Sequence, residues 1–319
     1  MFFLKKHFMA STAVALLSAT SVIQQVQAMD SVHLRTHSIS QPYIDQDLQN
    51  RWFDFGGDSI VNTNKHIRLT QDEPSQFGWL WSRLPLSAPN YQIEFEFSVG
   101  GKGTGLYGDG FAVWLTKERG EVGPVFGNRD KFEGLGIFFD TYANSRQSHS
   151  FPYVMAMLGD GKTSYDNDHD GLGNRIGSCE SDFRGRNIPT KGRLTYDSDE
   201  RTVNLKLQVK EWDQWDDCFT LYDIKLPSAY LGFTAHTGEV HDSHDIISVS
   251  STYTIKTDAE KNAKRNNYDN NNYKNNTPPP SKKSGFSWLF KLITASGIFA
   301  GIVVVAYKTS KKKNDMKRF

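Results

Sequence analysis

The chain has 319 residues, with 37 Lys or Arg against 36 Asp or Glu, so its formal net charge at pH 7 is +1. This balance gives no electrostatic field strong enough to indicate nucleic-acid binding, and the basic residues that do cluster lie near the C-terminus. Composition therefore argues against a nucleic-acid partner and leaves the other function classes open.

The first 28 residues have the pattern of a secretory signal peptide. Lys5 and Lys6 precede the apolar run AVALL, and residues 26–28 (VQA) supply the small side chains of a cleavage site. The mature protein is expected to begin near Met29, in an oxidising compartment. Cys179 and Cys218 then predict a disulfide bond, with two buried free thiols as the alternative, because sequence does not show how close their Cα atoms come.

Residues 31–256 are predicted to form one domain of about 225 residues, a size that β-sandwiches reach without splitting. Apolar and polar residues alternate at Tyr91 to Val99 and at Thr202 to Val209, which predicts strands with one solvated face. Three more continuously apolar runs are expected to be inner strands: Phe111 to Leu115, Leu135 to Phe139 and Tyr153 to Leu158. Frequent turns and the lack of a long amphipathic helix favour an all-β antiparallel sandwich.

Two acidic segments of this domain predict a calcium site. An apolar strand runs directly into Asp140 and then reaches Tyr142 and Asn144, and a second cluster, YDNDHDG, begins at Tyr165. Calcium takes about 6 to 8 oxygen ligands from carboxylates, amides and backbone carbonyls. Such oxygens, held at the end of a rigid strand, make this β-rich domain a candidate for metal-dependent binding.

The chain changes character after Lys256. Residues 257–285 are polar and rich in Asn, which predicts a disordered lumenal stalk, and Asn275 begins a glycosylation acceptor triplet within it. Residues 286–307 are apolar apart from Lys291, and about 22 residues at 1.5 Å rise reach roughly 33 Å, enough for a transmembrane helix. A buried core helix is the alternative, but a polar face is missing. The leader places residues 308–319 in the cytoplasm, in agreement with their basic charge.

Six motifs of the domain carry a family resemblance. They are YGDGFAVWLT (107–116), GPVFGNRDKFEGLGIFFDTYAN (123–144), FPYV (151–154), SYDNDHDG (164–171), CESDFR (179–184) and HTGEVHDSHDII (236–247). In this order they closely resemble the leguminous-type (L-type) lectins of the early secretory pathway, and the vesicular integral membrane lectin branch in particular. The resemblance implies a concanavalin-like sandwich and a type I membrane protein that binds high-mannose glycans and moves glycoproteins between endoplasmic reticulum and Golgi.

The resemblance also implies a set of metal ligands. The residues that match the family's calcium ligands are Asp140, Tyr142 through its backbone carbonyl, Asn144 and Asp170. Calcium bound there would fix the loop that carries Asn144 before a glycan arrives, so that its ordering does not weaken glycan binding. Cys179 and Cys218 match the family disulfide.

Carbohydrate binding is implied for a second, overlapping set of residues. Asp109 matches an acid that accepts hydrogen bonds from mannose hydroxyls, and Asn144 would contact both the metal and the sugar. Gly238 and Glu239 match a loop whose backbone N–H groups meet the ligand. Each such hydrogen bond contributes about 0.5–1.5 kcal/mol, so affinity for a single mannose is expected to be weak.

Two positions of the expected carbohydrate site depart from the family pattern. Asn167 stands where the family usually has a histidine that touches the sugar, and Trp79 stands where it has a small polar residue. An Asn side chain still donates a hydrogen bond, and an indole ring can cover the apolar C–H face of a sugar. Core packing is the alternative interpretation of Trp79.

Three other patterns do not indicate function. Residues 166–171 resemble the start of an EF-hand loop, but its twelfth position is Gly177 and no helices are predicted to flank it. The acids of EWDQWDD (211–217) resemble the paired carboxylates of sandwich-fold glycoside hydrolases, yet exposed charges explain them better. His236, His241 and His244 lack the spacing of a zinc site, and HDSHD (241–245) is expected to brace a loop.

Together these inferences predict a calcium-dependent, non-enzymatic receptor for high-mannose N-glycans on glycoprotein cargo, in the membranes between endoplasmic reticulum and Golgi. The C-terminal residues 317–319 (KRF) resemble a signal read by vesicle coat proteins, although Met316 stands where efficient retrieval needs a base. Two alternatives remain open. One is a membrane-anchored scaffold of the same fold without sugar binding, and the other is a sandwich-fold glycoside hydrolase.

Overall fold

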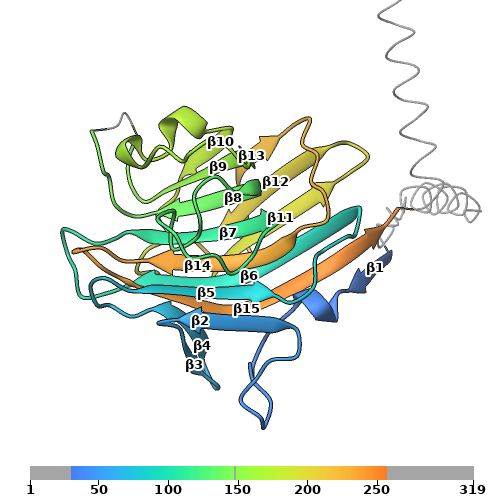
Figure 1. The fold of residues 1–319 in the computed structure, drawn as a ribbon, viewed down its shortest axis with the longest axis horizontal. Coiled ribbons are helices and arrows are strands. Elements are labelled where there is room, and N and C mark those ends of the chain that lie inside the picture. The colour runs from blue at the N-terminus through green and yellow to red at the C-terminus, as the bar shows by residue number, and fades with distance from the viewer. Residues whose placement is uncertain (1–29, 147–148, 257–319) are drawn as a thin grey trace, which may run out of the picture. The chain divides into compact units, whose positions relative to one another are not determined.

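The computed structural model describes residues 30–146 and 149–256, which form two antiparallel β-sheets packed face to face (Figure 1). The predicted signal peptide, stalk, acceptor Asn275, transmembrane helix and tail lie outside the described residues. Within the described residues, no helix is long and apolar enough to cross a membrane.

One sheet has eight strands in the order β13-β12-β11-β6-β15-β4-β3, with β1 paired to β15 beside this path. Their bounds are β1 (Asp30–His33), β3 (Ile60–Asn62), β4 (His66–Thr70), β6 (Asn90–Gly100), β11 (Thr190–Asp197), β12 (Thr202–Gln208), β13 (Asp216–Leu221) and β15 (Ser243–Ile255). All of the pairings are antiparallel. Strand β15 thus joins the two halves of the sheet.

The other sheet has seven strands in the order β10-β9-β8-β7-β14-β5-β2, again all antiparallel. Their bounds are β2 (Phe53–Gly57), β5 (Phe77–Ser82), β7 (Gly110–Thr116), β8 (Glu133–Asp140), β9 (Tyr153–Asp160), β10 (Gly177–Glu180) and β14 (Tyr230–His236). The described residues add three short 3-10 helices: η1 (Arg35–His37), η2 (Asn167–His169) and η3 (Leu172–Asn174). The predicted all-β antiparallel sandwich is confirmed.

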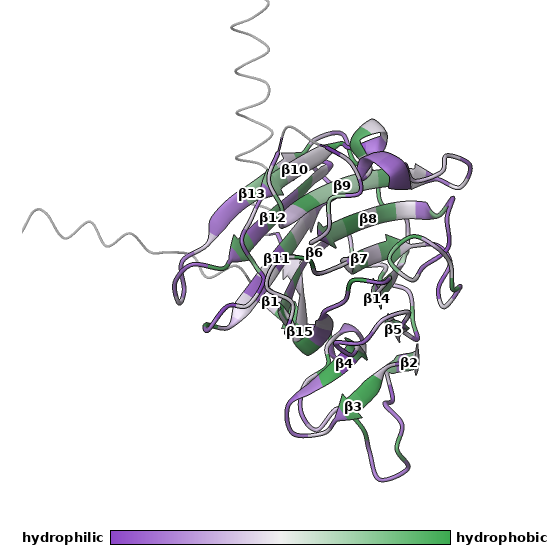
Figure 2. Cartoon of the chain, turned by 90° about the vertical axis from the view of Figure 1, so that its left-hand side faces the viewer, coloured by the Kyte–Doolittle hydropathy of each residue, from purple (hydrophilic) through white to green (hydrophobic). Residues whose placement is uncertain are grey.

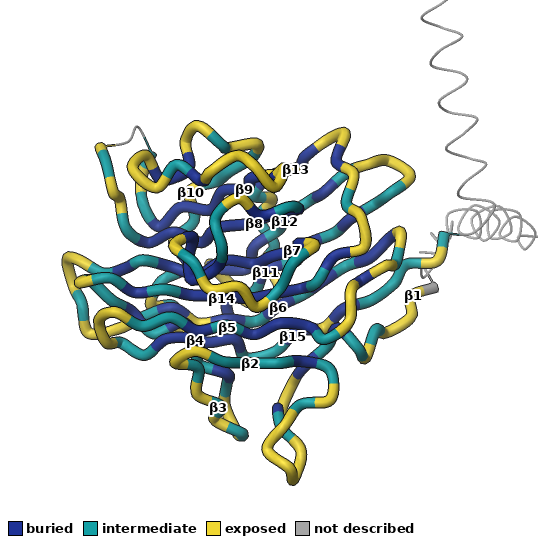
Figure 3. The backbone as a smooth tube through the Cα atoms, in the orientation of Figure 1, coloured by how far each residue is buried: buried dark blue, intermediate teal, exposed yellow. Residues whose placement is uncertain are grey.

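The main core lies between the two sheets. Along β6, Ile93, Phe95, Phe97 and Val99 are buried and alternate with more exposed polar residues, as the period of two predicts. Phe95 and Phe97 contact Phe139 of the opposite sheet with ring centroids 5.9 and 5.2 Å apart. Burial concentrates along the strands and exposure in the turns (Figure 3). The alternation in the sequence therefore selects the face that packs.

Strands β7 and β8 are buried on both faces, because a second apolar cluster covers the outer face of their sheet. Trp114 and Phe138 point outward and pack against Phe126, Phe132 and Tyr165, which come from the segments after β7 and β9. These two strands appear largely hydrophobic in Figure 2. This double burial explains why their sequences run without alternation.

The predicted disulfide bond is present. Cys179 in β10 and Cys218 in β13 form it, with their Cα atoms 5.1 Å apart. Strand β10 is the edge of one sheet and β13 the edge of the other, so the bond ties the two layers together at one side of the sandwich. The interpretation as two free thiols is excluded.

Candidate functional site

The candidate site forms where β8 and β14 end and β7 begins. Asp140 lies opposite Gly110, and Gly110 lies opposite His236, so these residues form one row across three strands. Gly110 has φ +140°, and a Cβ atom there would overlap the carbonyl oxygen of Phe139. Only glycine therefore fits between the two polar neighbours, and Asp109 follows directly beyond the row.

Asp109 is held by its backbone and by its side chain. Its carbonyl oxygen accepts hydrogen bonds from Thr141 N at 2.9 Å and Thr141 Oγ1 at 3.1 Å, and its own N–H donates to the carbonyl of His236 at 3.3 Å. Its Oδ2 lies 2.9 Å from His236 Nδ1. A Cβ atom on Gly238 would lie 3.5 Å from Asp109 Oδ1, so the carboxylate sits against this loop. Its position is thus fixed from three segments.

Two further carboxylates lie beside Asp109 and are almost completely buried. Asp140 is 3% exposed and Asp170 is 2% exposed. Asp170 Oδ1 accepts hydrogen bonds from Asn144 N at 2.9 Å and from Asn144 Nδ2 at 2.8 Å, and Asp140 Oδ1 accepts one from Tyr142 N at 3.0 Å. The predicted calcium ligands therefore contact each other in two pairs, Asp140 with Tyr142 and Asn144 with Asp170.

The electrostatics of this cluster favour a bound cation. Burial, and to a smaller extent the nearby charges of Asp170 and Asp109, raise the pKa of Asp140 well above its ordinary range, against the hydrogen bond from Tyr142. Asp140 forms no ion pair with any described residue. The hydroxyl of Tyr165 is buried nearby without a hydrogen-bond partner in the described structure. A buried carboxylate such as that of Asp140, with further oxygen donors beside it, is an arrangement that hard cations occupy.

A pocket of about 170 Å³ opens at this point, and it brings together part of the predicted site. Of the sequence-predicted residues, Asp109, Asp140, Asn144 and Asn167 line it. The remaining wall residues were not predicted as sugar contacts: Pro124, Phe126, Tyr165 and His236. Gly238 lies behind Asp109, and Glu239 is exposed on the same loop.

The missed residues differ in how much signal the sequence offers. His236 begins the HTGEV motif, but only the register of β14 against β7 places it beside Asp109. Phe126 and Tyr165 appear in the sequence as ordinary core aromatics, and they do pack against Phe138 with ring centroids 5.3 and 4.7 Å away. Their second role, as pocket walls, depends on tertiary structure that no local pattern encodes.

Trp79 packs in a way that matches its alternative interpretation. Its indole lies over Gly56 of the neighbouring strand β2, where a Cβ atom would overlap the ring. It also contacts the outer apolar cluster and does not belong to the pocket wall. Core packing of Trp79 is therefore observed, while contact with a sugar stays a prediction.

The other discounted patterns behave as expected. No α-helix flanks residues 166–177 in the described structure. Of the acids of 211–217, Glu211 and Asp213 lie between β12 and β13, whereas Asp216 and Asp217 begin β13, and Asp216 pairs with Lys210 at 2.8 Å. His241 Nδ1 contacts Asp72 at 2.8 Å and thus braces its loop. Among the described residues, no group of three or more His, Cys, Asp or Glu could hold a metal ion. A cation at Asp140 and Asp170 would accordingly need amide and carbonyl oxygens as well.

Residues 30–261 of this β-sandwich match the model of the Legume-like lectin family, and the chain belongs to that family. It is 38% identical over 233 residues to an L-type lectin-like domain-containing protein of Schizosaccharomyces pombe, covering 72% of this chain and 74% of that protein. It is 35% identical over 283 residues to the VIP36-like protein of Mus musculus, covering 85% and 80%.

Solved structures of related domains agree with this assignment. The exoplasmic/lumenal domain of VIP36 in a Ca²⁺/Man3GlcNAc-bound form is 34% identical, with a TM-score of 0.65, and the match covers 70% of this chain and 93% of that one. Its Ca²⁺/Man-bound form is 33% identical, with a TM-score of 0.68 and coverage of 71% and 93%. The predicted resemblance to the vesicular integral membrane lectin branch is confirmed.

Proposed function

We propose that this protein is a calcium-dependent, non-enzymatic lectin for high-mannose glycans that sorts glycoprotein cargo between the endoplasmic reticulum and the Golgi. One observation carries the proposal: a carboxylate (Asp109), an amide (Asn144) and a buried acid (Asp140) line one small pocket. Solved VIP36 domains hold Ca²⁺ and mannose-containing ligands, which supports the same ligand class here.

In this proposal calcium is held by Asp140, the Tyr142 carbonyl, Asn144 and Asp170. The close contacts of Asn144 with Asp170 and of Tyr142 with Asp140 support this ligand set, since each buried carboxylate already lies beside one other predicted ligand. Bound calcium supplies positive charge that offsets the repulsion between the two buried carboxylates. Its effect on Asn144 is to fix the orientation of the side chain that meets the glycan.

The sugar is recognised by hydrogen bonds to Asp109 and Asn144, with the Gly238–Glu239 loop donating from its backbone. His236 holds the carboxylate of Asp109, and Asn167 provides a further amide at the pocket wall. Vicinal hydroxyls both donate and accept, so this mixture of acceptor and donor groups complements them. The aromatic wall formed by Phe126 and Tyr165 suits the C–H face of a hexose.

The sorting role extends from the lectin domain to segments outside the described residues. Relatives of this chain are named as vesicular integral-membrane proteins, which supports a secretory-pathway membrane location. A helix at 286–307 would anchor the domain with its pocket in the lumen, and the tail at 308–319 would engage vesicle coat proteins. Glycan binding and transport are thus assigned to separate parts of one chain.

Calorimetry on the full-length protein in detergent micelles tests the lectin function. A high-mannose oligosaccharide is titrated into wild type, Asp109→Ala and Asn144→Ala, once in the presence of calcium and once in the presence of excess chelator. Wild type is expected to bind the oligosaccharide in calcium but not in chelator, and neither variant should bind it measurably. Asp223→Asn serves as a control, because Asp223 is an exposed acid paired with Arg201 on a distant turn.

The alternatives give different results in the same experiment. A scaffold without lectin activity would show no heat with any glycan, although its fold and calcium binding remain intact. A glycoside hydrolase would release shorter oligosaccharides on prolonged incubation, which chromatography of the mixture detects. Binding that persists in chelator would overturn the calcium requirement while leaving sugar recognition in place.

A further inference from the structure

Two loops beside the pocket present the groups that the proposed function assigns to the sugar. The first, residues 101–109, connects β6 to β7 and ends in Asp109, and the second, residues 237–242, connects β14 to β15 and includes Gly238. Much of the first loop is exposed, with Leu106 at 70%. Neither loop belongs to a strand pair, so other contacts must fix them relative to each other.

Arg184, which follows β10, contacts both loops. Its Nε and Nη2 atoms donate to the two carboxylate oxygens of Asp242, each at 2.7 Å. Nη2 also donates to the carbonyl oxygen of Gly103 at 2.9 Å, and the guanidinium lies 3.7 Å from the centre of the Tyr107 ring. The side chain of Arg184 is 15% exposed and that of Asp242 is fully buried. A rigid, charged fork thus joins one loop to the other.

Asp72, at the end of β4, joins the same two loops from another direction. Its Oδ2 accepts a hydrogen bond from Lys102 N at 2.8 Å, and its Oδ1 lies 2.8 Å from His241 Nδ1. Gly101 lies so close that a Cβ atom there would overlap the carboxylates of Asp72 and Asp242. The backbone of the first loop therefore rests directly on both acids.

We propose that Arg184 and Asp72 are positioning residues that lock the two sugar-contacting loops in register. The inference rests on the proposed function and adds residues to it that lie outside the pocket wall. Each residue contacts both loops, so loss of either one loosens the link between the segments that carry Asp109 and Gly238, even though the backbone of Asp109 stays bonded to Thr141. A glycan must then order these segments when it binds, and its affinity falls. The calcium site is untouched, since neither residue contacts Asp140, Asn144 or Asp170 in the described hydrogen bonds and ion pairs.

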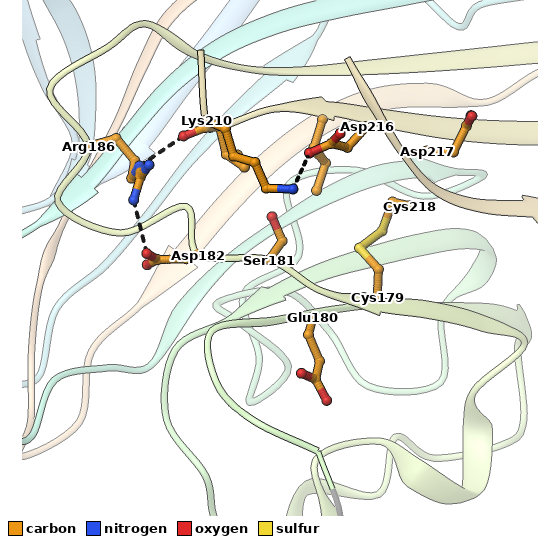
Figure 4. A pocket seen from close by; sticks show the side chains of 11 residues that line it. Cys179, Glu180, Ser181, Asp182, Arg186, Lys210, Asp216, Asp217 and Cys218 are labelled. Atoms are coloured by element: carbon orange, nitrogen blue, oxygen red, sulfur yellow. Dashed lines mark hydrogen bonds and ion pairs between the residues drawn. A yellow bond between two sulfur atoms is a disulfide. The ribbon is translucent and has the colours of Figure 1, made fainter. Parts of the chain in front are cut away.

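The test compares Arg184→Met with Arg186→Met in the full-length protein. Arg186 is a matched control, because it also donates to an acid, Asp182, at 2.9 Å and to a carbonyl, that of Val209, at 2.8 Å. These partners line the groove at the disulfide and not the sugar loops (Figure 4). Removing either arginine costs the same charge, but Arg184 makes two bonds to a buried acid whereas Arg186 makes one to an acid that is 72% exposed.

Loss of Arg184 is expected to raise the dissociation constant for a mannoside about tenfold or more, with the calcium dissociation constant changed by less than about twofold. Asp72→Asn should act in the same direction. Arg186→Met should change neither constant. This division between sugar and calcium affinity distinguishes positioning from general damage to the fold, which would weaken both.

Two further measurements keep the proposal open to refutation. Arg184→Met combined with Asp242→Leu removes both charges, so no unpaired buried acid remains if the single variant fails to fold. Amide hydrogen exchange of residues 101–108 and 237–242 reports loop order without any sugar, and should accelerate in the Arg184 and Asp72 variants. If wild type binds no mannoside, the proposed function is wrong, and the amide exchange rates alone then show whether Arg184 and Asp72 hold the two loops together. Unchanged exchange rates and unchanged sugar affinity in the Arg184 and Asp72 variants would overturn the proposal that these residues lock the loops.

Discussion

Two pockets in the described part of this domain differ in how their charges are compensated. The larger one, about 340 Å³, lies at the disulfide, where Arg186 pairs with Asp182 and Lys210 with Asp216. The smaller one, about 170 Å³, contains Asp140, which is 3% exposed and has no basic partner among the described residues. Exposed pairs of the first kind contribute about 0–1 kcal/mol each, whereas a buried uncompensated acid is costly without a ligand.

Charge compensation, and not size, therefore distinguishes the candidate binding site from the groove at the disulfide. The disulfide groove satisfies its own charges and has little to gain from a ligand. The smaller pocket gathers oxygen donors at the cost of stability in the free protein, and the proposed cation would restore that stability. Acids that repel each other in the folded state are therefore the signature to follow.

The largest expected effect on stability concerns Asp140. Asp140→Asn removes the buried charge, so without calcium the variant should be at least as stable as wild type. With calcium at a thousandfold excess over its dissociation constant, wild type should gain about 4 kcal/mol in free energy of unfolding and the variant nothing. Urea unfolding with calcium and with chelator measures both values. Asp216→Asn in the groove is the control, and an equal calcium gain in Asp140→Asn would remove this residue from the metal site.

The disulfide provides the next largest effect. The bond closes a chain segment with a sequence separation of 39, for which the loss of chain entropy in the unfolded state corresponds to about 4 kcal/mol. Cys179→Ser with Cys218→Ser should lower the free energy of unfolding by about this amount. Mannoside affinity at low temperature should stay the same. Lost affinity in a folded variant would show that the groove side also shapes the pocket.

A buried histidine makes the pocket side sensitive to acid. Burial, with smaller effects of Arg184 and His236, lowers the pKa of His244 from 6.5 to about 3. Below pH 6.5 this histidine takes up a proton in the unfolded chain but stays neutral in the folded protein. The free energy of unfolding therefore falls as the pH decreases. At pH 5.5 this group should cost about 1.4 kcal/mol, measured by urea unfolding without calcium. His244→Gln should reduce the loss, whereas His33→Gln, on an exposed residue, should not.

The smallest expected effect concerns His236. Nδ1 of its ring lies 2.9 Å from Asp109 Oδ2. His236→Ala removes this hydrogen bond and should weaken mannoside binding about fivefold, which corresponds to about 1 kcal/mol. His169→Ala is the control, because His169 makes a similar contact of 2.9 Å with Asp166 on an exposed turn. Calorimetry distinguishes the two. Equal affinities for both variants would mean that the backbone alone orients Asp109.

Much of the fold could be predicted from local patterns, because alternation at Tyr91 to Val99 directly reports which face of β6 packs. The site was accessible through the motifs that contain Asp109, Asn144 and Asp170, and the structure brings these residues together. Register and loop packing were not accessible. They decide that His236 reaches Asp109 and that Trp79 settles on Gly56.

Phe126 constrains how the proposed sugar preference of this protein can evolve. Its ring packs against Phe138, and its carbonyl oxygen accepts a hydrogen bond of 2.6 Å from Thr234 Oγ1, so the same residue supports the outer core and forms a wall of the pocket. Substitutions there alter recognition only together with folding. Asn167 lines the same pocket from a short, partly exposed turn and carries no such burden. Natural variation in glycan choice should therefore accumulate at this position before it reaches the aromatic wall.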